Sequence, residues 1–274
     1  MNVCKGTFRR AQNALYFHLQ TLCLFTKYDT KTILLPITLL AIASAPLSSA
    51  YHLPHVIFWI WFHLLQFNVS NQLLQPEEDA LNKPDRPLPS NRLSLPQAIL
   101  LRWCLVPLCL GLSDCYSVEA LYVSIAVVAL TFLYNEGSAH RQHWLIRNAV
   151  NAAGLACFED WIPTVLTQLR RCQYSSQLAF FTTTVHAQDF RDELGDRAVG
   201  RRTIPITLPS VARYTVVVPL TLWSAGLTMA WKLDFAASIS LISFSLFVGM
   251  RYILFNTVES DKVSYSWHNV RVVL

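Results

Sequence analysis

Long apolar stretches alternate with short polar loops along the whole chain. Each stretch is about as long as a helix that crosses the hydrocarbon core of a bilayer, which takes roughly 20 residues. The pattern predicts eight membrane-spanning helices, over residues 33–50, 52–71, 95–112, 118–134, 144–166, 176–188, 214–231 and 235–255. No long polar segment remains for a separate soluble domain. We therefore expect residues 1–274 to form a single all-α domain, a polytopic transmembrane helix bundle.

The composition also indicates a membrane protein. Of the 274 residues, 53% are hydrophobic and 14% are charged, whereas roughly a quarter of the residues of an average soluble domain are charged. Basic residues gather before the first predicted span and after most even-numbered spans, so the positive-inside rule places the amino terminus and these loops in the cytosol. The net charge of +5 reflects this topology, and no basic stripe with interleaved aromatic residues indicates a nucleic-acid partner.

The same features predict a multi-pass protein whose partner is the lipid bilayer. The first thirty residues carry scattered charge and lack the apolar core of a cleavable signal peptide. If the host is eukaryotic, an uncleaved polytopic chain of this kind most simply resides in the endoplasmic reticulum membrane. The sequence gives no indication of the oligomeric state.

Two acidic clusters follow predicted spans, in cytosolic loops over about 71–94 and 189–210. The first contains polar residues spaced by four and the second contains carboxylates spaced by three and four: Asn71, Gln75 and Asp79, and Asp189, Asp192 and Asp196. On a helix, each set projects from one face. Carboxylates beside an apolar core are costly unless a cation lies between them. Facing each other, the clusters would form an oxygen-rich cup for a hard divalent cation, most simply Mg2+ holding a phosphate or diphosphate.

These clusters supply the candidate site residues. We expect the four aspartates to act as catalytic metal ligands and Asn71 and Gln75 to supplement them. Basic side chains close to both clusters are suited to grip phosphate oxygens: Lys83, Arg86, Arg197, Arg201 and Arg202. Polar residues at the ends of two spans are expected to line the mouth of the cavity: Tyr134, Asn135, Arg147 and Asn148. Two simpler interpretations remain, a solvated turn between helices for the first cluster and plain salt bridges for the second.

On these motifs the chain resembles the UbiA superfamily of intramembrane prenyltransferases. The resemblance rests on Asp79-Ala-Leu-Asn82-Lys-Pro-Asp-Arg86-Pro-Leu-Pro-Ser90 and on Asp189-Phe-Arg-Asp192-Glu-Leu-Gly-Asp196, which continues to Thr203-Ile-Pro. It covers nearly the whole chain. It implies a helix bundle that binds a prenyl diphosphate through Mg2+ held by two Asp-rich motifs.

The chain departs from the family pattern at two places. The first motif of the family usually reads Asn-x-x-x-Asp-x-x-x-Asp, whereas the middle position here is Gln75, a neutral amide that offers an oxygen but no charge. Family members have nine membrane helices, and residues 267–274 lie about where a ninth would begin. With Gln75 at this position, the chain resembles a fungal branch of the superfamily that includes membrane-bound terpene cyclases of secondary metabolism.

Three hypotheses of function follow. The first, which the branch resemblance favours, is a Mg2+-dependent terpene cyclase that ionises farnesyl diphosphate, or next geranylgeranyl diphosphate, and cyclises the carbocation. The second is a prenyltransferase that moves the prenyl group to an aromatic or other acceptor. The third is a non-catalytic membrane protein that binds a prenyl diphosphate. In an enzyme, His186 is a candidate proton acceptor, and several aromatic side chains are candidates to stabilise positive charge: Trp59, Trp61, Phe62, Trp103 and Tyr134.

Overall fold

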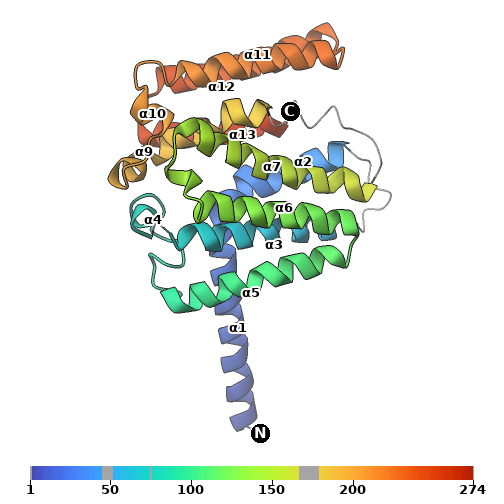
Figure 1. The fold of residues 1–274 in the computed structure, drawn as a ribbon, viewed down its shortest axis with the longest axis vertical. Coiled ribbons are helices and arrows are strands. Elements are labelled where there is room, and N and C mark those ends of the chain that lie inside the picture. The colour runs from blue at the N-terminus through green and yellow to red at the C-terminus, as the bar shows by residue number, and fades with distance from the viewer. Residues whose placement is uncertain (1, 45–51, 75, 167–178, 274) are drawn as a thin grey trace.

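The chain folds into a bundle of long helices with short helices gathered at one end. The computed structural model describes residues 2–44, 52–74, 76–166 and 179–273. Figure 1 shows the long helices lying side by side, with α4, α9 and α10 at one end of the bundle and α1 extending away from it. The elements in chain order are α1 (Asn2–Asp29), η1 (Thr30–Leu34), α2 (Leu35–Ser44), α3 (His52–Gln72), α4 (Pro76–Asn82), α5 (Leu95–Asp114), α6 (Val118–Asn135), η2 (Ala139–Arg141), α7 (Trp144–Leu166), η3 (Val185–Gln188), α9 (Asp189–Ala198), α10 (Ile204–Thr207), α11 (Tyr214–Ala230), α12 (Phe235–Leu254) and α13 (Val258–Val273).

The prediction of an all-α bundle is confirmed. Six of the eight predicted spans coincide with α3, α5, α6, α7, α11 and α12 to within two residues at each end. The first predicted span begins in the π-helical turn η1 and continues in α2, and its residues 45–50 lie outside the described part of the chain. Of the sixth span, residues 176–178 also lie outside it, residues 179–184 are helical, and the end is the 3-10 helix η3.

Local sequence signals specify where several of these helices begin. Ser94 and Gln97 form a capping box at the start of α5. The side chains of Ser117 and Asp234 accept hydrogen bonds from the backbone N–H groups of the third residue of α6 and of α12. Such caps satisfy donors that a helix start leaves without partners. The starts were therefore readable from the chain itself.

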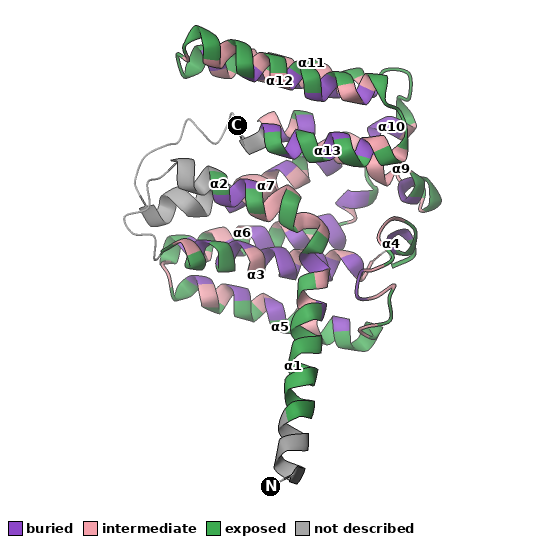
Figure 2. Cartoon of the chain, turned by 180° about the vertical axis from the view of Figure 1, so that it is seen from behind, coloured by how far each residue is buried: buried purple, intermediate pink, exposed green. Residues whose placement is uncertain are grey.

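The outer surface of the bundle is apolar. Large hydrophobic side chains on its outermost helices are widely exposed, among them Leu100 on α5, Leu222 and Met229 on α11, and Phe235 on α12. Figure 2 shows the same helices carrying exposed residues along their outer faces and buried residues toward the centre. Among the described helices, α5, α6 and α12 are long and apolar enough to cross a bilayer by length and composition. Exposed apolar area of this extent is unusual on a soluble monomer and is expected of a surface that contacts lipid.

Helix α13 is an element that the hydrophobic pattern did not reveal. The chain continues past residue 258 as a helix that packs against α12, α9 and α2. Its inward face is polar: Asp261, Ser264, His268 and Arg271 are each less than 5% exposed. Because these side chains are buried against other helices and not against lipid, the segment does not read as a hydrophobic span. The eight predicted spans therefore did not include this helix.

The first acidic cluster does not lie on one continuous helix. Helix α3 ends at Gln72 and α4 begins at Pro76. A proline has no N–H to donate and is favoured in the first turn of a helix, so Pro76 starts a new helix and does not extend α3. The expected four-residue periodicity from Asn71 to Asp79 is thus interrupted, although both residues reach the same cavity.

Candidate active site

A cavity at the end of the bundle collects most of the predicted site residues. It holds about 1180 Å³ of empty space, counting its open mouth. Helices α3, α6 and α7 supply apolar walls, including Leu64, Phe67, Leu130 and Phe158. Charged side chains come from Asp29 at the end of α1, from α4 and the loop after it, and from the start of α7. Others come from α9 and the loop that follows it. One end of the cavity is therefore polar and the rest is apolar.

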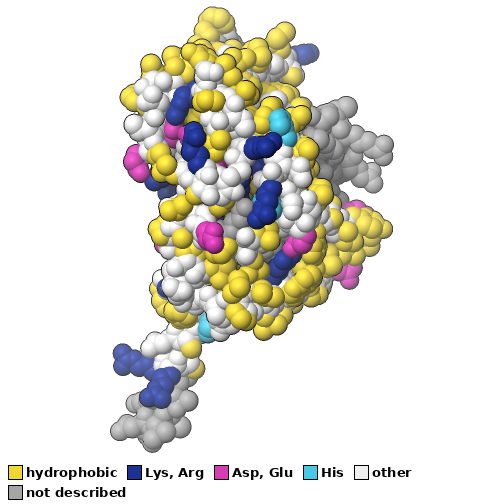
Figure 3. Space-filling model, turned by 60° about the vertical axis from the view of Figure 1, so that its left-hand side comes forward, with side chains coloured by type: hydrophobic (Ala, Val, Ile, Leu, Met, Phe, Trp, Pro, Cys, Tyr) yellow, Lys and Arg dark blue, Asp and Glu magenta, His cyan; other side chains and the backbone are white. Residues whose placement is uncertain are grey.

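Figure 3 shows the charged side chains gathered on one face of the molecule among surfaces that are largely hydrophobic. Among the described residues that line the cavity, six are carboxylates: Asp29, Glu78, Asp79, Asp189, Asp192 and Asp196. Five are cationic: Lys83, Arg86, Arg147, Arg191 and Arg201. Such a balanced set can hold both a divalent cation and a polyanion.

Ion pairs order these charges. Arg86 Nη1 lies 2.6 Å from Asp79 Oδ1, and Arg201 Nη1 lies 2.9 Å from Asp196 Oδ1. Asp189 is paired with Arg147 from α7, and both side chains are almost fully buried. A buried charge without a partner is strongly destabilising, so each base offsets part of the cost of burying its carboxylate.

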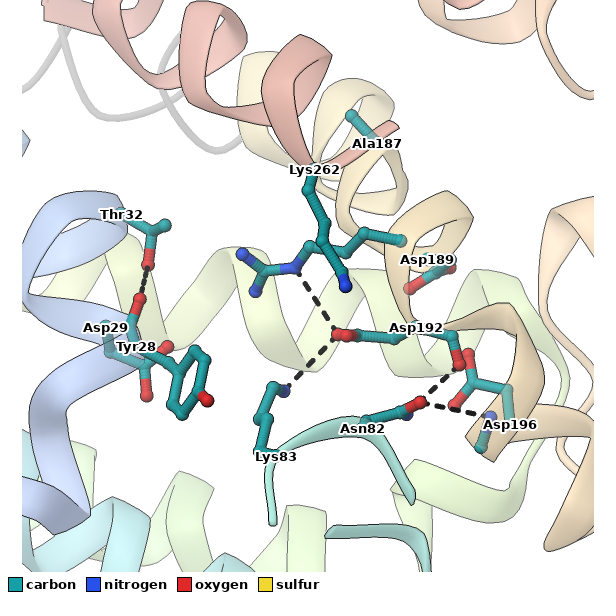
Figure 4. A network of polar contacts seen from close by, with 12 residues as sticks. Tyr28, Asp29, Thr32, Asn82, Lys83, Ala187, Asp189, Asp192, Asp196 and Lys262 are labelled. Atoms are coloured by element: carbon teal, nitrogen blue, oxygen red, sulfur yellow. Dashed lines mark hydrogen bonds and ion pairs between the residues drawn. The ribbon is translucent and has the colours of Figure 1, made fainter. Parts of the chain in front are cut away.

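The two acidic clusters meet directly. Lys83, after the first cluster, places its Nζ 3.4 Å from Asp192 Oδ2 in the second. Asn82 donates to the backbone carbonyl of Asp192 at 3.2 Å and accepts from Gly195 N–H at 3.2 Å. Figure 4 shows Asn82, Lys83 and Asp192 converging, with Asp189 and Asp196 on the same helix. The expectation that the clusters face each other is borne out by this geometry.

The pKa values of the carboxyls shift in opposite directions. Burial raises the pKa of Glu78 to about 7, although the Arg201 guanidinium acts in the other direction. Burial also raises the pKa of Asp79, of Asp189 and of Asp196, each against the pull of its arginine. Burial would raise the pKa of Asp192 too, but Lys83 and Arg191 outweigh it and hold that pKa below its usual range. The sharing of positive charge thus keeps Asp192 the most readily ionised member of the second cluster.

The donor set suits a hard cation. Asp79 Oδ2 and Asp196 Oδ2 are buried and accept no hydrogen bond within the described chain, and carboxylate and amide oxygens are the ligands that Mg2+ prefers. In the same residues, no group of three or more Asp, Glu, His or Cys side chains stands at metal-binding distances. Each carboxylate instead faces a base, so metal binding would require some carboxylates to exchange an arginine or lysine contact for the ion.

The structure separates the predicted site residues into three groups. Ten line the cavity: Asn71, Asp79, Lys83, Arg86, Tyr134, Arg147, Asp189, Asp192, Asp196 and Arg201. Four do not: Asn135 and Asn148 are buried, Arg197 bonds Glu193 with about half of its side chain exposed, and Arg202 is exposed. Gln75 lies outside the described residues. Roles for all of them stay predictions.

The structure also adds lining residues that the motifs did not single out. Arg191 lines the cavity although it lies between Asp189 and Asp192 on α9, and its guanidinium stacks 4.2 Å from the ring centroid of Tyr265. Asp29 reaches the cavity from the end of α1 and lies 3.8 Å from Arg86. Among the aromatic candidates, Tyr134 lines the cavity together with Phe67 and Phe158, whereas Trp103 is about half exposed on α5. Which of these residues line the cavity is determined by how the helices pack, not by the sequence motifs.

This fold and this cavity define a polytopic helical membrane protein with a site for a ligand that has an anionic head and an apolar body. The UbiA prenyltransferase family matches residues 33–270, and the chain belongs to this family. It is an integral membrane enzyme that uses a prenyl diphosphate, as a terpene cyclase or a prenyltransferase.

Curated relatives include both kinds of enzyme. The chain is 33% identical over 261 residues to a fumagillin beta-trans-bergamotene synthase of Aspergillus fumigatus, covering 91% of this chain and 88% of the relative. It is 27% identical to a diterpene cyclase of Hericium erinaceus, covering 89% and 82%. It is also 28% identical over 177 residues to a polyprenyl transferase of Hericium erinaceus, covering 62% and 60%.

Solved structures share the fold. A UbiA homolog from Archaeoglobus fulgidus bound to GPP and Mg2+ matches with a TM-score of 0.69 at 14% identity, over 92% of this chain and 99% of that one. A digeranylgeranylglyceryl phosphate synthase matches with a TM-score of 0.64 at 18% identity, over 93% and 95%. At these identities the likeness establishes the arrangement of helices alone.

Proposed function

We propose that the protein is a Mg2+-dependent terpene cyclase that ionises a prenyl diphosphate, with farnesyl diphosphate favoured and geranylgeranyl diphosphate next, and cyclises the resulting carbocation in terpenoid secondary metabolism. The observation that carries the proposal is the division of one cavity into a charged end and an apolar body. The similarity of the chain to two cyclases favours this reaction over prenyl transfer.

At the charged end, the four aspartates Asp79, Asp189, Asp192 and Asp196 would hold Mg2+, which when bound polarises the diphosphate as a leaving group. Arg86, Lys83 and Arg201 have side chains that can turn from their carboxylates to the diphosphate oxygens. When the allylic C–O bond breaks, its electron pair leaves with the diphosphate, and these bases neutralise the developing negative charge.

In the apolar body, the chain's task is to exclude water and to shape the cation. Val127, Leu130 and Leu155 offer no nucleophile, so the cation is not captured by the walls. The aromatic faces of Phe67, Tyr134 and Phe158 can stabilise positive charge as it migrates. Attack by the distal double bond of the same molecule then closes a ring, and loss of a proton restores neutrality.

The experiment supplies membranes containing the protein with farnesyl or geranylgeranyl diphosphate and Mg2+, without an acceptor, and measures diphosphate release and extracted hydrocarbons by gas chromatography with mass spectrometry. Asp192→Asn is the test variant, and Glu193→Gln is the matched control, because Glu193 is the next residue on α9 but does not line the cavity. We expect a cyclic hydrocarbon that Asp192→Asn abolishes and Glu193→Gln retains.

Prenyl transfer is the second candidate, and the polyprenyl transferase relative is the observation that favours it. It predicts diphosphate release only when an aromatic or other acceptor is supplied, with the prenyl group recovered on the acceptor. Absence of turnover under both conditions, with binding of the prenyl diphosphate retained, would leave the non-catalytic hypothesis that Gln75 suggests.

We also propose that the protein resides in the endoplasmic reticulum membrane if its host is eukaryotic. The multi-pass character of the chain supports this placement. Fractionation of cell membranes with a tagged full-length chain tests it, and recovery with another organelle's marker would contradict it.

A further inference from the structure

A second cavity adjoins the first one. It holds about 610 Å³ of empty space, counting its open mouth, and its lining shares Ile33, Leu155, Val185 and Gln188 with the main cavity. These shared residues place the two spaces next to each other. A ligand that fills the main cavity would therefore lie close to the lining of the second one.

Helix α13 gives this second cavity a polar wall. Tyr265, His268 and Asn269 line it, on successive positions of one helical side. His268 is 4% exposed, and its Nδ1 is buried with no hydrogen-bond partner within the described part of the chain. Buried polar atoms are normally paired, so a buried imidazole nitrogen without a partner, on a residue of the cavity wall, calls for an explanation.

The position of His268 is set by a stack of three side chains. Its ring lies parallel to that of Tyr265, with centroids 5.9 Å apart and planes 12° apart. The guanidinium of Arg191 stacks on Tyr265, 4.2 Å from the ring centroid. Arg191 lines the first cavity beside Asp192, so the stack spans from the charged end of the site to the second cavity.

We propose that His268, the imidazole in the wall of the second cavity, is the proton acceptor that ends the carbocation reaction. This inference rests on the cyclase activity proposed above. In the step, a C–H bond next to the cationic carbon breaks, its electron pair forms the new C=C bond, and the proton goes to the imidazole. The imidazolium then returns the proton to solvent after the product has left.

The other basic groups of the site are less suited to this step. His268 is the one imidazole among the described residues that line the two cavities. His186, the acceptor expected from the sequence, lines neither of them and bonds Thr215 Oγ1 at 2.8 Å through Nε2. The carboxylates of the first cavity are engaged with arginine and lysine side chains.

The experiment compares His268→Asn with His186→Asn, a second buried histidine, in membranes supplied with the preferred prenyl diphosphate and Mg2+. Two quantities are measured separately: the rate of diphosphate release and the distribution of terpenoid products. We expect His268→Asn to release diphosphate within about 3-fold of the wild-type rate, because ionisation would occur among the carboxylates and bases of the first cavity, whose lining does not include His268. The share of the main hydrocarbon should fall at least 10-fold, replaced by other alkenes or by an alcohol formed with water. His186→Asn should keep the wild-type distribution.

Three outcomes are distinguishable. An unchanged product distribution in His268→Asn would overturn the assignment of His268, and so would a shift confined to His186→Asn. Absence of acceptor-free diphosphate release in the wild-type protein would overturn the cyclase proposal itself. Where His268→Asn does not fold, as judged by size-exclusion chromatography in detergent, His268→Gln takes its place. A substrate carrying deuterium at the carbon that loses the proton adds an independent measurement, since the wild-type product ratio should change with the label and that of the variant should not.

Discussion

Arg201 and Glu78, 123 residues apart in the sequence, form an ion pair in which Nη2 lies 2.7 Å from Oε2. The same guanidinium lies 2.9 Å from Asp196 Oδ1 through Nη1. One side chain therefore fastens the helix of the first acidic cluster to the helix of the second. Charge-assisted bonds of this kind are among the stronger ones in proteins.

Replacing Arg201 should be far more harmful than replacing Arg197. Arg201→Gln removes two charge-assisted contacts in a buried site, each of about 1.5–3 kcal/mol, and we expect a loss of about 100-fold or more in kcat/KM for diphosphate release. Arg197→Gln removes an exposed pair with Glu193 on the same helix, which contributes roughly 0–1 kcal/mol, and activity should stay within about 2-fold. Equal losses in both variants would contradict the placement of Arg197 outside the site.

Gly195 is required for the contact between the two clusters. A Cβ at this position would lie 2.7 Å from Asn82 Cγ, which is too close for the Asn82 side chain to keep its present position. Gly195→Ala should displace Asn82, break its bonds to the Asp192 carbonyl and the Gly195 N–H, and lower activity by about 10-fold or more, since overpacking costs about 1–3 kcal/mol. Gly226→Ala on α11, where a Cβ meets nothing within 4 Å, is the control and should remain active.

Glu78 should make stability depend on pH. Its pKa is raised by burial from 4.5 to about 7 in the folded protein, so the folded state binds more protons than the unfolded state between these values. Stability then falls as pH rises through this window, by at most about 3 kcal/mol for this group.

Glu78→Gln removes that contribution, and the thermal midpoint of the variant in detergent without metal should decline less than that of the wild-type protein between pH 4.5 and pH 7. Glu259→Gln changes a largely exposed carboxyl and serves as the control. Parallel curves for wild type and Glu78→Gln would show that the carboxyl ionises normally.

The cavity wall at Gly154 should select the length of the prenyl chain. Gly154 lines the apolar body on α7, and a Cβ there meets nothing within 4 Å. Gly154→Leu adds a side chain to open space, which shortens the room for the apolar tail. We expect kcat/KM for geranylgeranyl diphosphate to fall at least 10-fold relative to that for farnesyl diphosphate. Gly111→Leu, on α5 and away from the cavity, should leave the ratio unchanged.

The positions of the helices and of the two motifs were readable from the sequence because the signals for them are local. A bilayer-length run of apolar residues, a Ser or Asp cap and a proline act over a few neighbours. The same is true of the carboxylates at positions 189, 192 and 196, whose spacing alone puts them on one face of α9, and all three line the cavity.

The polar helix α13 could not be recognised in this way. Its buried face carries Asp261, His268 and Arg271, and polarity of that degree indicates a solvated segment unless the partners are known. Those partners come from elsewhere in the chain: Arg213 pairs with Asp261 at 2.8 Å, and Ser224 and Ser245 bond Arg271 at 2.6 and 2.7 Å. Asp261 and Arg271 are stable in the interior because the fold supplies partners for both.

By itself, then, the sequence determined the class of fold, the boundaries of six long helices and the two acidic motifs. Each of these depends on residues close together in the chain. Only the tertiary structure decided which base meets which acid, that Arg201 and not Arg197 faces the cavity, and that Arg147 pairs with Asp189. It also brought His268 to the second cavity. These relationships join residues on different helices or on opposite sides of one helix, and packing of the whole bundle sets their distances.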